Sequence, residues 1–282
     1  MPSLTLLGQS LLSGIFIGAL YGLLGLGLSL SWGMLRQINL AHFALAFLGA
    51  YLTFQLSSVG WDPIATLALV VPCFFAFGAL MHWLLARFSI TPFNSLLVTF
   101  GLTVILESVI QGIWTADPRR LDSAYGAIRY KIGALYVPFP ELLTLVLAAT
   151  LCIVAWAGLR YTEFGRAMRA VAEDASIAAA FGVNERALSL LLSGLAAAFA
   201  GVAGLCLALS FTLAPSQIYS WIGVVFAAVM IGGLGNPIGP LVAGIVIGVS
   251  EALTMALTAP TWAPLVSFSL LIAVLLARAK KI

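Results

Sequence analysis

Long stretches without a single charged residue dominate this chain of 282 residues. Residues 187–250 form the longest stretch, and residues 142–159 form another. The other charge-free runs are 1–35, 37–61, 63–86, 88–106 and 252–277. Because a hydrocarbon core about 30 Å thick needs about 20 helical residues to cross it, each run is about long enough for at least one membrane span. The chain is therefore predicted to be a membrane protein.

Proline and glycine positions divide the longest run further, which gives nine hydrophobic segments in all. Their predicted cores are 10–31, 38–56, 64–86, 94–115, 140–159, 187–209, 218–233, 239–257 and 264–277. The composition agrees, since 8% of the residues are charged against about 25% in soluble domains. We predict an all-α polytopic membrane protein with eight or nine transmembrane helices, some broken or re-entrant, in a single domain over residues 1–282. A barrel would need alternating strands of about ten residues instead.

The basic residues predict the orientation of the chain in the membrane. Nine of the 13 Lys and Arg residues fall in connections that one orientation places together in the cytoplasm. They are Arg36, Arg87, Arg160, Arg166, Arg169, Arg186, Arg278, Lys280 and Lys281. The remaining four, all in residues 116–139, would then face outward. Nine spans would leave the N-terminus outside, unless the uncharged first segment is re-entrant.

The most polar part of the chain is residues 160–186, RYTEFGRAMRAVAEDASIAAAFGVNER. Between Glu163 and Phe181, apolar residues recur at three- and four-residue spacing, which predicts an amphipathic helix. Gly182 suits the end of this helix. Two interpretations remain open: a helix that lies against the membrane surface, or a helix that docks in the groove of a soluble partner.

Two acidic residues, Glu107 and Glu251, lie far inside apolar segments. A carboxylate inside a bilayer is costly, so such residues usually face a cavity or another helix. Both are candidates for the translocation path, and a protonated or hydrogen-bonded structural role is the alternative. The further candidates for this path are Asn39, His42, Asn94, Thr99 and Asn236. Asn94 also follows Pro92 in an arrangement that suits a helix N-cap.

Two places interrupt the apolar segments. One is GGLGNPIGP at residues 232–240, and the other runs from Asn39 to His42. The first is either a tight hairpin at the membrane surface or an unwound region beside a substrate path. The candidate hinge residues are Gly182, Gly232, Gly233, Gly235 and Pro237.

Glycines also recur at helical spacing, at positions 14, 18 and 22 and again at 244 and 248. Small residues on one helix face allow neighbouring backbones to approach closely in a membrane. We interpret these positions as helix packing within the bundle.

Catalytic and metal-binding motifs are not recognisable in this sequence. His42 and His82 are the only histidines, and metal sites need three or four converging ligands. The sequence contains neither a phosphate-binding loop nor a nucleophile elbow. We therefore expect no metal, no cofactor and no enzymatic activity in this chain, and no nucleic-acid partner. Cys73, Cys152 and Cys206 are interpreted as core residues.

Four stretches in order resemble one known family. They are GLSLSWGMLRQINLAHFALAFLGAY (27–51), NSLLVTFGLTVILE (94–107), YTEFGRAMRAVAEDASIAAAFGVN (161–184) and GGLGNPIGPLVAGIVIGVSEAL (232–253). The chain resembles the permease subunits of branched-chain amino acid ABC transporters. It departs from the expected pattern N-x-A-H-G-E after Asn39, because Phe43 and Ala44 follow His42. This departure puts in doubt any substrate or proton role carried over to that position.

The resemblance implies a multi-pass protein of a bacterial-type inner (plasma) membrane that works with several partners. These are a second homologous permease, identical or different, two cytoplasmic ATPase subunits that hold ATP and Mg, an extracytoplasmic solute-binding protein and the lipid bilayer. It also implies that segment 160–186 couples the permease to the ATPases. The coupling candidates are Glu163, Phe164, Gly165, Arg166, Met168, Arg169, Glu173 and Asp174.

Alternative functions remain compatible with the sequence. Related permeases handle urea, short-chain amides and small carboxylated solutes, so the substrate can differ from a branched-chain amino acid. A second class of function is a proton-coupled secondary transporter that uses Glu107 or Glu251 and needs no ATPase.

Overall fold

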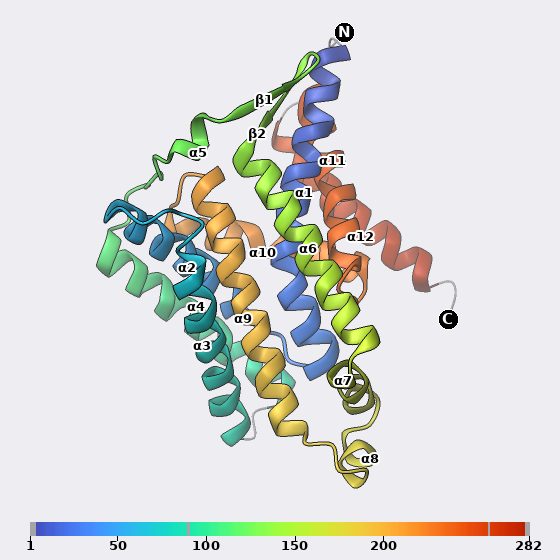
Figure 1. Cartoon of the computed structure of the whole chain (residues 1–282). Helices are drawn as coiled ribbons and strands as arrows, with labels where there is room; N and C mark the ends of the chain where they lie inside the picture. The colour runs from blue at the N-terminus through green and yellow to red at the C-terminus, as the bar shows by residue number, and fades with distance from the viewer. Residues whose placement is uncertain (1–3, 89–90, 259, 280–282) are drawn as a thin grey trace.

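The computed structural model describes residues 4–88, 91–258 and 260–279, which form an elongated helical bundle (Figure 1). The long helices are α1 (Leu4–Leu35), α2 (Ala41–Ser58), α3 (Leu67–Arg87), α4 (Pro92–Trp114), α6 (Phe139–Tyr161), α9 (Glu185–Ser210), α10 (Ile218–Gly232), α11 (Gly239–Leu257) and α12 (Ala263–Ala279). The short elements are α5 (Ala124–Ala127), β1 (Arg129–Ile132), β2 (Leu135–Pro138), α7 (Glu163–Glu173), α8 (Ala175–Ala180) and the 3-10 turns η1 (Pro215–Gln217) and η2 (Pro260–Trp262).

Eight helices in the described part of the chain are long and apolar enough to cross a membrane. The remaining long helix is α2, which carries the polar residues His42, Thr53 and Gln55 and is largely buried by its neighbours. The predicted all-α polytopic fold is confirmed. The first segment is not re-entrant, because α1 is one continuous helix of 32 residues. At 1.5 Å per residue it is about 48 Å long, more than the hydrocarbon core requires.

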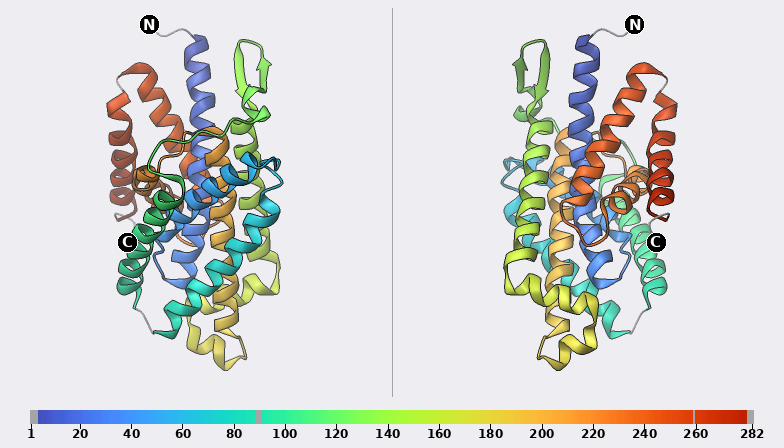
Figure 2. Two further views of the ribbon diagram at one scale, coloured as in Figure 1. Left: turned by 90° about the vertical axis from the view of Figure 1, so that its left-hand side faces the viewer. Right: turned by 90° about the vertical axis from the view of Figure 1, so that its right-hand side faces the viewer.

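The bundle has two distinct ends (Figures 1 and 2). The β1–β2 hairpin and the start of α1 lie at one end, which we call the hairpin end. α7 and α8 lie at the opposite end, which we call the α7–α8 end. The basic residues at the α7–α8 end are Arg36, Arg87, Arg160, Arg166, Arg169 and Arg186. Those between α4 and α6, the segment that includes the hairpin, are Arg119, Arg120, Arg129 and Lys131. The predicted grouping of these basic residues is thus observed. The side chain of Arg278, and Lys280 and Lys281, lie outside the described residues.

The hairpin end is organised by short contacts outside the helices. β1 and β2 pair antiparallel, with Arg129 opposite Pro138, and Gly133 turns between them with a φ of 62°. The Tyr125 hydroxyl donates a hydrogen bond to Asp62 at 2.6 Å, which ties this loop to the connection between α2 and α3. This hydrogen bond lowers the pKa of Asp62.

Glycines bring α1 and α11 into direct backbone contact. A Cβ atom on Gly18 would lie 2.4 Å from the carbonyl oxygen of Gly244, and one on Gly248 would lie 2.4 Å from that of Gly14. A Cβ on Gly22 would lie 2.6 Å from the Cα of Leu241. The spaced glycines therefore serve helix packing within this chain, as the sequence predicts. We call this contact the glycine seam.

α1 and α9 form the centre of the bundle. In their most apolar windows, 72% and 78% of the residues are buried, whereas the figure for α12 is 11%. The outer helices therefore leave broad apolar faces uncovered, as expected for surfaces in contact with lipid or with another membrane protein.

Candidate functional site

The predicted coupling segment, residues 160–186, contains two short helices, which we continue to call the coupling segment. The sequence predicts one amphipathic helix from Glu163 to Phe181, but α7 ends at Glu173 and α8 begins at Ala175. The reason is Asp174, which has extended backbone angles and caps α8. Its carboxylate accepts hydrogen bonds from the backbone amides of Ser176 and Ile177 at 2.9 and 3.1 Å. The predicted end at Gly182 is confirmed, since this residue follows α8 with a φ of 84°.

The α6–α7 corner holds α7 firmly against the bundle. Thr162 caps α7 by accepting a hydrogen bond from the Gly165 amide at 3.2 Å, and its hydroxyl donates to the Gly158 carbonyl. A Cβ on Gly165 would lie 2.1 Å from the carbonyl oxygen of Leu159, so only glycine fits there. Arg169 donates a hydrogen bond to the same Leu159 carbonyl at 2.5 Å. Arg169 therefore anchors α7 to α6.

α7 buries one face and exposes the other. Met168 is fully buried among residues of α1, α6 and α9, and Phe164 packs at the edge of this cluster. On the outer face, the side chains of Glu163 and Arg166 are 96% and 60% exposed and form an ion pair at 3.7 Å. Glu173 is also exposed. The predicted coupling residues thus divide into an anchoring set and a surface set.

Two apolar residues that the sequence analysis did not single out lie at the tip of the coupling segment. Ile177 in α8 is 58% exposed, and Phe181, which follows α8, is 85% exposed. On a helix that continued beyond Asp174, both residues would lie well off the apolar stripe of Phe164, Met168 and Val171, and this mismatch is the sequence signal that could have identified them. The break at Asp174 gives α8 a direction of its own.

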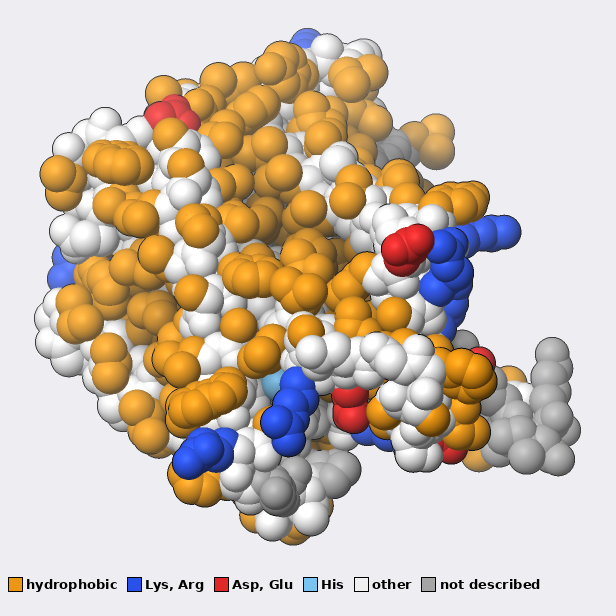
Figure 3. Space-filling view, turned by 60° about the horizontal axis from the view of Figure 1, so that its bottom comes forward, with side chains coloured by type: hydrophobic (Ala, Val, Ile, Leu, Met, Phe, Trp, Pro, Cys, Tyr) orange, Lys and Arg blue, Asp and Glu red, His pale blue; other side chains and the backbone are white. Residues whose placement is uncertain are grey.

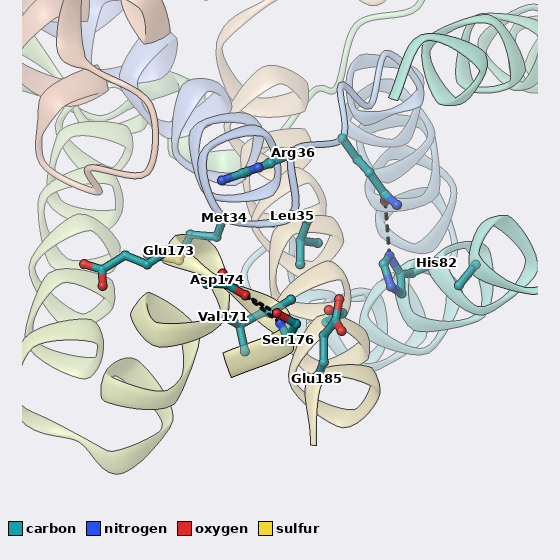
Figure 4. A pocket seen from close by; sticks show the side chains of 13 residues that line it. Met34, Leu35, Arg36, His82, Val171, Glu173, Asp174, Ser176 and Glu185 are labelled. Atoms are coloured by element: carbon teal, nitrogen blue, oxygen red, sulfur yellow. Dashed lines mark hydrogen bonds between the residues drawn. The ribbon is translucent and has the colours of Figure 1, made fainter. Parts of the chain in front are cut away.

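A cavity of about 500 Å³ opens beside the coupling segment. In the view of Figure 4, Asp174 and Ser176 lie on one side and His82 on the other, with Glu185 of α9 between them. Arg36, at the end of α1, lines it and donates a hydrogen bond to the Ala172 carbonyl at 3.1 Å. This bond joins the α1–α2 connection to α7.

The charged residues around this cavity lie at the α7–α8 end of the molecule. Figure 3 shows charged side chains gathered near the α7–α8 end, with hydrophobic side chains over much of the remaining surface in view. The pKa of Asp174 is lowered, chiefly by the hydrogen bond from the Ser176 hydroxyl and then by the Ile177 amide, with a smaller effect of Arg36. The carboxylate is therefore held in its charged form.

The break between α1 and α2 is held by Thr99 of α4. The Thr99 hydroxyl accepts a hydrogen bond from the Leu40 amide at 3.1 Å and lies 3.3 Å from the Ile38 carbonyl, to which it can donate. The side-chain oxygen of Asn39 is buried there and has no hydrogen-bond partner among the residues that the structure describes. Asn39 and Thr99 line a common small cavity with His82. The structure therefore brings together two of the predicted path residues.

The other polar candidates lie apart from this pair. His42 is 1% exposed, and its Nε2 bonds the Leu24 carbonyl at 2.9 Å, which fastens α2 to α1. Asn94 is exposed, and Thr91 is the N-cap of α4 instead, accepting a hydrogen bond from the Asn94 amide. The Asn236 side chain accepts a hydrogen bond from the Ile238 amide at 3.1 Å within the turn between α10 and α11.

The 232–240 segment is a tight connection between α10 and α11. Gly233 and Gly235 have φ angles of 94° and 75°, which favour glycine. The Gly235 amide donates to the Ser29 carbonyl at 3.0 Å, and Gly232 packs directly against Gly239. Pro237 is buried. These contacts dock the turn on α1, and a hinge role for it stays a prediction.

The two predicted membrane acids occupy different environments. Glu251 is 7% exposed and accepts hydrogen bonds from the hydroxyls of Tyr21 at 2.8 Å and Ser267, which join α11 to α1 and α12. Glu107 lies nearer the surface, where Tyr219 donates to it at 2.6 Å and Gln111 at 3.1 Å. Both carboxylates therefore link side chains within the chain, and a role in the path is a separate prediction.

The described residues form a polytopic helical bundle, and one amphipathic segment is fastened to its end. The family model described as the permease component of branched-chain amino acid transport systems matches residues 10–275. The high-affinity branched-chain amino acid transport system permease protein LivH of Salmonella typhimurium is 28% identical over 95% of this chain and 92% of its own length. BraD of Pseudomonas aeruginosa, described in the same words, is 25% identical over 99% of this chain and 96% of its own length.

An archaeal protein is also similar: the probable branched-chain amino acid transport permease protein LivH of Methanocaldococcus jannaschii is 28% identical over 88% of this chain and 81% of its own length. No solved structure matches the chain. The chain belongs to the family of permease components of branched-chain amino acid transport systems. It is a multi-pass permease of the inner membrane and a transport component rather than an enzyme.

Proposed function

We propose that this chain is the membrane subunit of an ATP-driven importer of branched-chain amino acids and that separate ATPase subunits dock on α7 and α8. The observation that carries the docking proposal is the division of this segment into an anchored face and an exposed face. The exposed face combines the apolar tip of Ile177 and Phe181 with the charged pair Glu163 and Arg166. An apolar centre with a charged rim is the usual composition of a protein interface.

The anchored face provides a route for mechanical coupling. Arg169 and Gly165 fasten α7 to the end of α6, and the bond between Arg36 and the Ala172 carbonyl fastens it to the α1–α2 connection. A displacement of α7 by the ATPases would therefore act on α6 and on the break between α1 and α2. That break contains Asn39, which we propose as part of the translocation path.

The remaining partners follow from the same proposal. A second homologous permease would complete the path, and an extracytoplasmic solute-binding protein would deliver the substrate at the hairpin end. Two ATPase subunits would bind ATP and Mg at the α7–α8 end, which would then face the cytoplasm. This orientation also satisfies the distribution of basic residues.

Uptake by the reconstituted transporter distinguishes the proposed substrate and energy source from the alternatives. We expect leucine uptake that requires ATP and the partner subunits, and no comparable uptake of urea or acetamide. Uptake driven by a proton gradient through the isolated chain would instead support a secondary transporter that uses Glu107 or Glu251.

The docking surface is tested by the double substitution Ile177→Ala with Phe181→Ala. Central apolar anchors of an interface each contribute about 2 kcal/mol or more, so we expect ATPase binding to weaken by at least roughly a hundredfold. Quantitative co-purification and leucine-dependent ATP hydrolysis would measure this loss. Phe88→Ala is the matched control, because Phe88 is 72% exposed and directly follows α3. A double variant that binds ATPase like the control would refute the docking proposal.

A further inference from the structure

A second cavity, of about 340 Å³, lies at the hairpin end between α1, α6, α9 and α11. Its walls are mainly apolar and include Phe16 and Leu20 of α1 and Met255 of α11. Glu141 of α6 and Ser210 of α9 contribute polar groups. Cavities of about 300–1,000 Å³ with apolar walls and a few polar groups are typical of small-molecule sites.

Glu141 contributes a negative charge to this cavity. It is the third residue of α6, directly after the β1–β2 hairpin, and it is only partly exposed. Among the described residues no Lys or Arg forms an ion pair with it, although Arg129 of β1 acts on it electrostatically. An acid in the first turn of a helix is also favoured by the helix dipole. The experiment below therefore also tests whether Glu141 serves only to stabilise α6.

Three acids of the membrane helices, Glu107, Glu141 and Glu251, differ in how their carboxylates are engaged. Both oxygens of Glu251 accept hydrogen bonds, from Tyr21 and Ser267. Both oxygens of Glu107 are engaged as well, by side chains of the same chain. Glu141 has no comparable side-chain hydrogen bond among the described residues. It is therefore the acid of the three whose charge is available to a ligand.

Ser210 adds a second polar group without a partner. Its hydroxyl oxygen is buried and makes no hydrogen bond with the described residues. A buried hydroxyl without a partner is unfavourable, and such groups are rare in folded proteins. A ligand that forms a hydrogen bond with this hydroxyl would remove that unfavourable free energy.

We propose that this cavity is a binding site for an aliphatic amino acid. The α-ammonium group would lie on Glu141 and the α-carboxylate on the Ser210 hydroxyl, with the branched side chain against Phe16, Leu20 and Met255. The site rests on the proposed transport function and adds to it a substrate site within this chain at the end where substrate arrives. A neighbouring cavity of about 330 Å³ shares Ile17 and Phe211 with it and extends the hollow toward α10.

The experiment measures binding of radiolabelled leucine to the purified transporter in nanodiscs, without the solute-binding protein. Glu141→Gln removes the charge at constant size, so we expect leucine binding to weaken by roughly tenfold to a hundredfold. Competition by 4-methylpentanoate, which is leucine without its ammonium group, should be weak in the wild type. In Glu141→Gln the preference for leucine over this analogue should largely disappear, whereas Ser210→Ala should weaken both ligands alike.

Two matched controls isolate the cavity. Asp122→Asn removes an exposed negative charge in the loop preceding the hairpin, and Ser108→Ala removes a hydroxyl that bonds only within α4. Both should bind leucine like the wild type. Glu141→Gln binding within twofold of the wild type would overturn the proposal. So would an unchanged preference for leucine combined with a lower melting temperature, because this combination identifies Glu141 as a helix-stabilising acid.

Leucine binding and leucine uptake by the wild-type transporter distinguish failure of the proposed site from failure of the proposed transport function. A preparation that takes up leucine with its binding protein and ATP, but binds none without the binding protein, refutes the site and leaves the function in place. A preparation with no leucine uptake at all, and active uptake of another solute, refutes the proposed substrate. Leucine binding that depends on Glu141 supports both.

Discussion

Substitution of Gly18 by alanine tests whether the glycine seam sets the spacing of α1 and α11. The new Cβ would lie 2.4 Å from the Gly244 carbonyl oxygen and 2.5 Å from the Cα of Ile245. A carbon atom normally approaches a carbonyl oxygen to about 3.3 Å at closest. Because both obstacles are backbone atoms, no side-chain rotation relieves the contact, and the helices must separate locally by about 1 Å.

Gly18→Ala should lower the free energy of unfolding, whereas a glycine-to-alanine substitution at a helical position with free space should raise it. Alanine is favoured over glycine in a helix by about 0.5–1 kcal/mol. Overpacking a well-packed contact costs about 1–3 kcal/mol. We therefore expect Gly18→Ala to lower the free energy of unfolding by about 1 kcal/mol, within a range of about 0–2.5 kcal/mol. At Gly101 of α4 a Cβ meets no atom within 4 Å, so Gly101→Ala should raise it by about 0.5–1 kcal/mol.

The assay is reversible unfolding of the purified permease in mixed micelles, with Gly101→Ala and Gly112→Ala as controls in free space. The two classes of variant should shift the unfolding midpoint in opposite directions. A Gly18→Ala protein at least as stable as the wild type would refute the backbone contact between α1 and α11. Equal destabilisation in all three variants would show instead that alanine is generally unfavourable in this bundle.

Two further predictions concern hydrogen bonds. Tyr21→Phe removes the hydroxyl donor 2.8 Å from the Glu251 carboxylate. It should lower the free energy of unfolding by about 0.5–2 kcal/mol in the same unfolding assay. An unchanged value would indicate that the Ser267 hydroxyl alone satisfies the carboxylate. The lowered pKa of Asp174 means that its contribution to α8 is complete above its ordinary pKa of 3.8 and is lost as the pH falls through the lower value of the folded state. A spin label at Ala180 should therefore become more mobile in acid, and Asp174→Ala should show that mobility at neutral pH; equal mobility in both proteins at pH 7 would contradict the capping role.

The sequence by itself determined the class of fold and the order of its parts. Length and hydrophobicity are local properties, so the apolar runs predicted the long helices with small errors at their ends, such as 140–159 against Phe139–Tyr161. The concentration of charge at 160–186 marked the segment that contains α7 and α8. Glycine and proline at 232–240 marked the turn between α10 and α11, because both residues disrupt a helix wherever it lies.

Only the tertiary structure decided which residues meet. Lipid and the protein interior are both apolar, so the pattern along a membrane helix does not reveal which side faces the bundle. For this reason Glu251 and Glu107 look alike in the sequence, although one is buried between three helices and the other lies near the surface. Nothing in the sequence distinguishes Glu141, because an acid at the start of a helix has an ordinary local explanation.

The coupling segment shows the same division between local and tertiary information. Its amphipathic character was evident from spacing, but its break at Asp174 depends on a competition between helix continuation and side-chain capping. The partition of Met168 to the core and Arg166 to the surface depends on how α7 is fastened to α6 by Gly165 and Arg169. Periodicity predicted that a helix exists there, and long-range contacts decided which of its faces remains available to a partner.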